Sequence, residues 1–246
     1  MGMYSRRLFF IIGLLPLFLL GLLSCEGRRD VRDYYFPVRQ LTGSDGKVYA
    51  YLRTGSQPGP DTAYWYYLGV DLDTALYLTT TGYGPDLSPR QLSREKITNE
   101  GSRLQELTAF ATDSAGRSVP TEMEVLYEHT FPFYLDGPGG GPYGYRLRGQ
   151  FAGSAAMTYV TLDRTEFRDT STFILGEERP GLCVRLFGEV SERDPELGDI
   201  SPTFSGYEIY TRGLGLTEYY RNLGAGGTFG GRLVRTLPMT EFARPQ

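Results

Sequence analysis

The chain has 246 residues, with 25 basic and 29 acidic side chains and a single histidine, which gives a formal net charge of −4 at pH 7. This mildly acidic balance argues against nucleic acid and anionic lipid surfaces as partners, because neither would be attracted by the protein as a whole. Two cysteines and one histidine are too few for a cysteine or histidine metal cluster, so the sequence predicts neither a metal nor a cofactor.

The first element is an export leader. Residues 1–7 carry Arg6 and Arg7 without an acid, and residues 8–23 form a stretch of sixteen uncharged residues that contains Pro16. A basic start followed by an apolar segment is typical of a secretory signal. A transmembrane helix needs about 20 apolar residues, so this interrupted stretch is short for that role.

The end of the leader resembles a known family. Leu22-Leu23-Ser24-Cys25 is similar to the lipobox of bacterial lipoproteins, although Leu23 is less usual there than a small residue. The resemblance implies cleavage after residue 24, a diacylglycerol on the thiol of Cys25, and an acyl chain such as palmitate on the new amino group. Several acyl chains make a durable membrane anchor. In enteric members, Asp after the cysteine retains the protein in the inner membrane. Glu26 stands there in this chain, which favours the outer membrane.

The export route stays open between two pathways. Ser5-Arg6-Arg7-Leu8-Phe9-Phe10 also resembles the twin-arginine motif, which directs folded proteins. The apolar segment after it is greasier than is usual for that route, which favours the general secretory pathway.

The mature chain reads as one domain on a short tether. Removal of residues 1–24 takes two arginines away and leaves 222 residues with 23 basic and 29 acidic side chains, a net charge of −6. Residues 25–33 are charged and poor in apolar side chains, which predicts a lipidated tether. Residues 34–246 are long enough for one β-rich domain with a substantial core.

Alternating polar and apolar residues predict an antiparallel sheet. In residues 143–151, aromatic and apolar side chains alternate with Arg146, Arg148 and Gln150, which is typical of a strand with one wet face. Residues 122–128 begin in the same way. The other predicted strands are 47–53, 63–70, 75–81, 104–112, 157–162, 182–190, 204–210, 215–220 and 231–237, all rich in β-forming residues.

Turn signals between these strands indicate hairpins. Residues 43–46, 99–102 and 113–116 each offer a glycine where the backbone turns. Residues 88–92, Ser-Pro-Arg-Gln-Leu, predict the one short helix, and residues 136–142 predict a mobile loop within one sheet system. The fold class is therefore mainly β: an antiparallel sheet that forms a curved half-barrel, a barrel or a sandwich, with at most one short helix.

Aromatic side chains give the main functional signal. Residues 25–246 contain 11 Phe, 18 Tyr and 1 Trp, clustered at 34–37, 64–67 and 131–134. On a strand, Tyr64-Trp65-Tyr66-Tyr67 places rings on both faces, and one face should enter the core. The other face is then covered by packing or forms a binding surface. These four residues are the candidate ligand-binding residues.

Catalytic signals are weak. His129 is the single histidine, and the sequence has no nucleophile-elbow motif that would supply a catalytic serine. Cys183 lies in a strand-like run, where a free cysteine is usually a small buried apolar residue. The carboxylates that could support a hydrolase are Asp71 with Asp73, and Glu122 with Glu124, because each pair shares a strand face. Solvated surface positions explain both pairs equally well, so an enzyme is not the preferred interpretation.

Three functions remain. The preferred one is a non-catalytic, lipid-anchored envelope protein that binds an apolar ligand in a curved sheet, similar in architecture to exported half-barrels of the lipoprotein-sorting type. The first alternative is a surface module that binds glycan or an envelope protein through its tyrosine-rich strands. The second is a carboxylate-based hydrolase.

Overall fold

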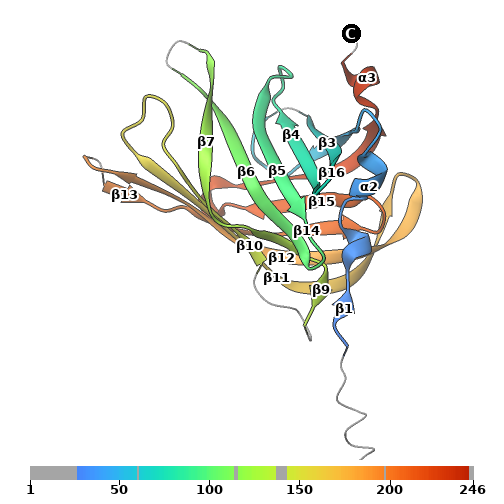
Figure 1. Cartoon of the computed structure of the whole chain (residues 1–246). Coiled ribbons are helices and arrows are strands. Elements are labelled where there is room, and N and C mark those ends of the chain that lie inside the picture. Colours follow the sequence, from blue (N-terminus) through green and yellow to red (C-terminus); the bar gives the residue numbers. More distant parts are fainter. Residues whose placement is uncertain (1–26, 60, 114–115, 137–142, 197, 244–246) are drawn as a thin grey trace, which may run out of the picture.

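The fold is a closed antiparallel β-barrel (Figure 1). The computed structural model describes residues 27–59, 61–113, 116–136, 143–196 and 198–243. Neighbouring strands around the ring are, in order, β11 (Met157–Ile174), β10 (Tyr143–Gly149), β7 (Ser118–Tyr127), β6 (Gly101–Thr112), β5 (Pro89–Ile97), β4 (Ala75–Tyr83), β3 (Thr62–Leu72), β2 (Lys47–Thr54), β16 (Thr228–Leu237), β15 (Gly215–Asn222), β14 (Thr203–Thr211) and β12 (Glu177–Asp194). The long β11–β12 hairpin, paired from Met157–Arg193 to Ile174–Glu177, closes the ring. The predicted fold class is confirmed.

Short strands and helices lie next to the twelve strands of the ring. β8 (His129–Pro132) pairs with β6, β13 (Gly198–Ile200) pairs with β12, and β1 (Arg29–Asp30) pairs with β9 (Tyr134–Leu135). The helices are short: η1 (Arg32–Tyr34), α2 (Val38–Leu41), η2 (Gly224–Gly226) and α3 (Met239–Phe242). None of the helices in the described ranges has the length and apolar character needed to span a bilayer.

The helix predicted at residues 88–92 is wrong, because this segment enters β5. Pro89 is the first residue of the strand, opposite Tyr83, where a proline is tolerated in a sheet. From Gln91 onward, the strand pairs with β4 on one side and β6 on the other. These two ladders outweigh the local helix-start signal of Ser88-Pro89.

β11 is much longer than the sequence predicts. The sequence predicts a strand that ends at Leu162, whereas the observed strand continues to Ile174 past a bulge at Glu166, which has a positive φ of 50°. The bulge shifts the side-chain alternation by one residue, so that Arg164 and Phe167 are both buried. This shift hides the second half of the strand from a period-two pattern.

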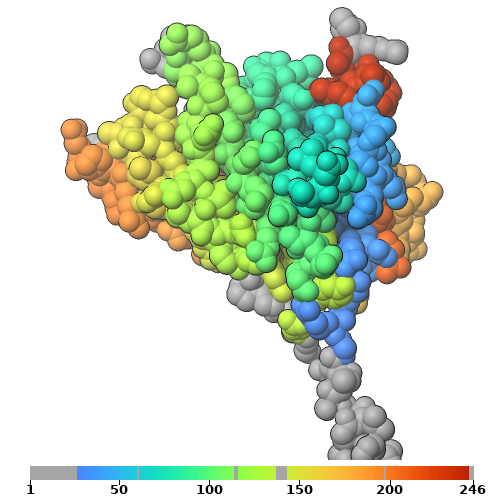
Figure 2. Space-filling view, viewed as in Figure 1, coloured from blue at the N-terminus to red at the C-terminus, as the bar shows by residue number. Residues whose placement is uncertain are grey.

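The segment after β1, residues 31–42, fills one end of the barrel, and we call it the N-terminal plug. Val31 and Leu41 are completely buried, and Tyr34, Tyr35 and Val38 are at most 6% exposed. Figure 2 shows the blue N-terminal segment at the surface beside the teal strands, where its polar side chains remain exposed. The last residues of the predicted tether 25–33 therefore belong to the fold.

The plug packs on β3 with its backbone in close contact with the strand at Gly69. A Cβ added at Gly69 would lie 2.4 Å from the carbonyl oxygen of Val38 and 2.9 Å from the amide nitrogen of Thr42. Only a residue without a side chain lets α2 pack this closely on the strand. The plug then joins the main buried cluster, which includes Tyr49, Tyr51, Tyr67, Phe131 and Leu233.

Other predicted features lie outside the described residues. These are the leader, the lipobox with Cys25, and residues 137–142 of the predicted loop.

Candidate functional site

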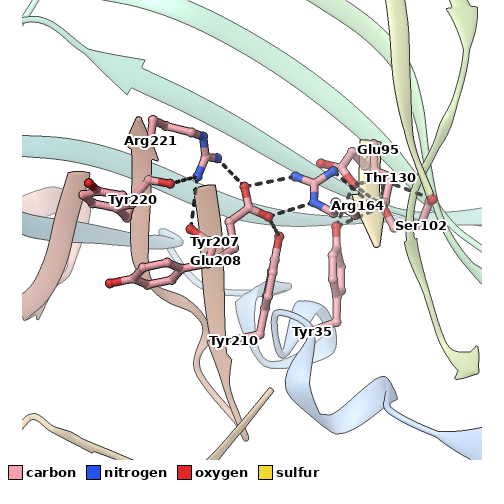
Figure 3. Close-up of polar contacts among 10 residues, drawn as sticks. All are labelled: Tyr35, Glu95, Ser102, Thr130, Arg164, Tyr207, Glu208, Tyr210, Tyr220 and Arg221. Atoms are coloured by element: carbon pink, nitrogen blue, oxygen red, sulfur yellow. Dashed lines mark hydrogen bonds and ion pairs between the residues drawn. The ribbon is translucent and has the colours of Figure 1, made fainter. Parts of the chain in front are cut away.

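A network of buried charges crosses the barrel next to the plug (Figure 3). Arg164 on β11 donates from Nε to Oε2 of Glu208 on β14 at 2.7 Å, and Arg221 on β15 donates from Nη2 to Oε1 at 2.5 Å. The Tyr210 hydroxyl donates to Oε2 of the same carboxylate at 2.9 Å. The Glu208 side chain is 3% exposed, and the two arginines are 11% and 13% exposed. Three strands are thus tied together by one carboxylate.

Burial and charge act in opposite directions on this network. Burial alone would raise the pKa of Glu208, but the charges of Arg164 and Arg221 and the hydrogen bonds outweigh it and lower the pKa to about 2. Burial likewise disfavours the charge of Arg164, yet Glu208 raises the pKa of this arginine well above its ordinary value. Both partners therefore stay ionised inside the barrel.

A second carboxylate attaches the plug to the network. Glu95 on β5 accepts hydrogen bonds at Oε2 from the Tyr35 hydroxyl at 2.9 Å, from Thr130 at 2.6 Å and from Ser102. The backbone carbonyl of Thr130 also accepts a hydrogen bond from Arg164 at 3.1 Å. Burial, and then the charge of Glu95, raise the pKa of Tyr35 well above its ordinary value, which keeps its hydroxyl neutral as a donor. Tyr35 thereby holds the plug in register.

A small cavity of about 80 Å³ lies beside this network, inside the barrel. Tyr35, Glu95 and Arg164 form its polar wall. Its apolar wall includes Leu104 and Leu107, which belong to a second buried cluster on β6, β7 and β10. Ligand pockets for drug-sized molecules usually measure about 300–1,000 Å³, so this cavity is suited to a few waters.

A larger hollow of about 440 Å³ lies between the plug and the ends of β4 and β5, and we call it the plug pocket. Its apolar floor consists of Tyr35, Phe36, Val38, Leu76, Ile97 and Phe133. Phe36 is fixed by stacking on Tyr67, with ring centroids 4.3 Å apart, and Tyr35 is fixed by Glu95. Arg32, Arg39 and Arg212 form its rim together with Asp33 and Gln40. An apolar floor with a few polar groups at the rim is the usual composition of a small-molecule site.

The four predicted binding residues do not form one site. Trp65 and Tyr67 face the barrel interior, where the Trp65 ring lies against Gly82 and Tyr67 packs on Phe36. Tyr64 and Tyr66 face outward. Tyr66 donates its hydroxyl to the carbonyl oxygen of Asp45 at 2.9 Å. Only Tyr67 contacts the floor of the plug pocket, through Phe36.

Tyr64 borders a separate hollow, which we call the outer groove. This groove of about 840 Å³ lies between the outer face of the sheet and α3. The Phe242 ring of α3 lies 5.1 Å from the ring of Tyr64 and 5.4 Å from that of Tyr83. Arg235 and Glu241, which form an ion pair, also line it. Figure 2 shows α3, in red, at the upper edge of the molecule.

The carboxylates considered for hydrolysis lie apart. Asp71 and Asp73 are exposed at the turn between β3 and β4, whereas Glu122 and Glu124 are exposed on β7, three strands away from β4 around the ring. Glu124 accepts a hydrogen bond from Nε of Arg148 at 2.9 Å. The barrel therefore does not bring the two pairs together.

The remaining candidates are placed as follows. The His129 ring lies 5.2 Å from that of Tyr127, at the start of β8. Cys183 is half-buried on β12, where burial raises the pKa of its thiol. Within the described ranges, no three His, Cys, Asp or Glu side chains converge as metal ligands.

Sequence reasoning missed the charge network and the plug pocket. A usable signal was present on β14, where Glu208 occupies the same face as Phe204 and Tyr210. On β11, Arg164 likewise lies on the same inward face as Val160 and Leu162. A charge on the apolar face of a strand needs a buried partner, although the sequence does not tell which residue that partner is.

No family model and no curated protein matches the chain. Among solved structures, a candidate lipoprotein from Parabacteroides distasonis ATCC 8503 is 12% identical, with a TM-score of 0.44. A candidate exported protein with a YmcC-like fold from Bacteroides fragilis NCTC 9343 is also 12% identical, with a TM-score of 0.48. Each match covers 78% of this chain and 95% of the other.

The charge network predicts a specific loss of stability in acid. Because the pKa of Glu208 is lowered from 4.5 to about 2, its contribution is complete above pH 4.5 and is lost as the pH falls toward 2. We expect Glu208→Gln to lower the free energy of unfolding by about 3–5 kcal/mol at neutral pH, since it leaves two buried arginines without their carboxylate.

Urea unfolding between pH 2 and pH 6 measures this effect. The variant should show a shallower decline in acid than the wild type, whereas Glu106→Gln, which changes an exposed carboxylate on β6, should follow the wild-type curve. Parallel curves for wild type and Glu208→Gln would contradict the assigned role.

Proposed function

We propose that this chain is a lipid-anchored, non-catalytic protein of the bacterial cell envelope that binds a small apolar or amphipathic molecule in the plug pocket. The single observation that supports the binding role is the pocket itself, about 440 Å³ with an apolar floor. This volume falls within the usual range for small-molecule sites. The interior cavity of about 80 Å³ is too small for such a ligand, which favours the barrel end over the barrel centre as the binding site.

The lipobox supports the anchor, with Cys25 as its attachment residue. Arg29, the first residue of β1, follows Cys25 by four positions, and an extended chain over four positions spans at most about 14 Å. An acylated Cys25 would thus hold the plug end of the barrel close to the bilayer. Glu26, where an inner-membrane protein of the enteric type has Asp, favours the outer membrane.

A non-catalytic role is supported by the surroundings of the candidate carboxylates. Glycoside hydrolysis needs two carboxyl groups that flank one bond of a bound sugar. Asp71, Asp73, Glu122 and Glu124 are all exposed, and none of them lines the plug pocket, the outer groove or the interior cavity.

A second candidate function is glycan binding in the outer groove. The observation that favours it is the grouping of Tyr64, Tyr83 and Phe242 along a groove of about 840 Å³. Aromatic rings offer flat apolar faces to the CH faces of sugars, and the tyrosine hydroxyls offer hydrogen bonds.

The anchor is tested by metabolic labelling. Cells that express the full chain and receive an alkyne fatty acid should yield a labelled protein that lacks residues 1–24. Cys25→Ser should abolish both the label and the cleavage, because the modified thiol is removed, whereas Cys183→Ser should change neither. An unlabelled, uncleaved wild-type chain would contradict the anchor.

The binding role is tested by what copurifies. Mature protein from cells, washed and then extracted with organic solvent, should release an apolar molecule that mass spectrometry detects. Leu76→Trp fills the pocket floor and should lose that molecule. Leu72→Trp is the matched control, since Leu72 is 52% exposed and does not line the pocket. Equal ligand in both variants, or none in the wild type, would contradict the proposal.

The glycan alternative is tested on a glycan array, followed by calorimetry of any sugar that binds. Tyr64→Ala should weaken binding about fivefold to tenfold, because one ring contact is worth about 1 kcal/mol. Tyr77→Ala changes a ring on the outer face of β4 that does not line the groove, and should bind normally. An array without any bound glycan would end this candidate.

A further inference from the structure

The rim of the plug pocket is positively charged, although the protein as a whole is acidic. Arg32, Arg39 and Arg212 line the pocket together with one acid, Asp33. Within the described residues, none of these three arginines takes part in an ion pair. This distinguishes them from most other arginines of the barrel, whose guanidinium groups are bound to carboxylates.

Two of the three guanidinium groups are held in place. Arg212, in the turn between β14 and β15, lies over the ring of Tyr34 at 5.3 Å. Arg32 donates to the hydroxyl of Tyr134 at 2.7 Å and lies over the ring of Phe133 at 5.3 Å. These contacts orient the cations without neutralising them. Arg39, on α2, is exposed at the same rim.

The single acid does not cancel this charge. Asp33 sits on the plug, and its backbone carbonyl accepts a hydrogen bond from the Gly213 amide at 2.9 Å, which holds the turn that carries Arg212 against the plug. Three cations against one anion leave the rim with a net charge of +2. Guanidinium groups bind carboxylates and phosphates through strong, charge-assisted hydrogen bonds.

We propose that the plug pocket selects single-chain amphiphiles with an anionic head group, whose chain lies on the apolar floor while Arg39 and Arg212 bind the head. The inference rests on the proposed binding function and adds the ligand class to it. A pocket of about 440 Å³ is near the lower end of the usual range, which suits one chain. Phe36 is held by stacking on Tyr67, and Tyr35 is held by its hydrogen bond to Glu95. Because these floor side chains are already ordered, ligand binding costs little conformational entropy.

The test uses the mature lipidated protein in phosphatidylcholine nanodiscs, with empty discs as the background. The probes are dansylaminoundecanoic acid and its methyl ester, which differ only in the charge of the head. We expect the acid to bind wild type at least about tenfold more tightly than the ester, since a charge-assisted hydrogen bond contributes about one factor of ten or more.

Variants locate the charge. Arg39→Gln with Arg212→Gln should weaken binding of the acid about tenfold or more and leave binding of the ester unchanged. Arg117→Gln, a change of an exposed arginine between β6 and β7, is the matched control and should bind both probes like the wild type. Thermal unfolding by circular dichroism verifies that each variant is folded.

The outcomes are distinguishable. Equal binding of acid and ester, or a double variant that binds the acid like the wild type, overturns the inference and leaves the proposed function standing. Failure of both probes to bind contradicts the proposed function and the inference with it.

Inorganic phosphate carries the charge without the chain and should not displace the acid. If phosphate displaced the fatty-acid probe at a concentration similar to that of the probe, the pocket would bind anions without recognising the chain, and the proposal would be overturned.

Discussion

The insertion of the N-terminal plug is the constraint on which the rest of this structure depends. A ring of about eight strands can be filled by its own inward side chains, and a wider ring needs additional material. In this barrel of twelve strands, residues 31–42 fill the additional space, because they place four buried side chains inside one end: Tyr34, Tyr35, Val38 and Leu41. The closed sheet, the main core and the plug pocket therefore share one segment.

The buried charges give that insertion a defined register. A buried ion pair is weak evidence for stability, because its desolvation cost offsets much of its attraction. Here Glu208 joins β11, β14 and β15 through Arg164 and Arg221, and Glu95 joins β5 to the plug through Tyr35. A shift of any of these strands by one residue would turn a charge outward and leave its partner buried and unpaired. We infer that the network contributes specificity more than stability.

Most of the fold could be predicted from the sequence, because period-two alternation and turn glycines are local signals. The closure of the ring could not, because no local pattern shows that β11 pairs with β12 as well as with β10, and the bulge at Glu166 shifts the alternation partway along that ladder. The cluster of aromatic residues at 64–67 is visible in the sequence, but the division of its rings between the interior and the outer face follows from the neighbours that cover each face. The plug pocket combines Leu76, Ile97 and Arg212 from distant strands and turns, a combination without any local signature.

The plug links the predicted anchor to the proposed site. Its first residues continue directly from β1, which lies within the predicted tether, and its next residues form one wall of the plug pocket. A ligand that binds the folded plug stabilises it by mass action, in proportion to the logarithm of ligand concentration over Kd. If Cys25 carries the proposed lipid, the chain between Cys25 and Arg29 is short enough to keep this segment close to the membrane. Within the described residues, β1, the plug and one wall of the plug pocket are one continuous segment of the chain.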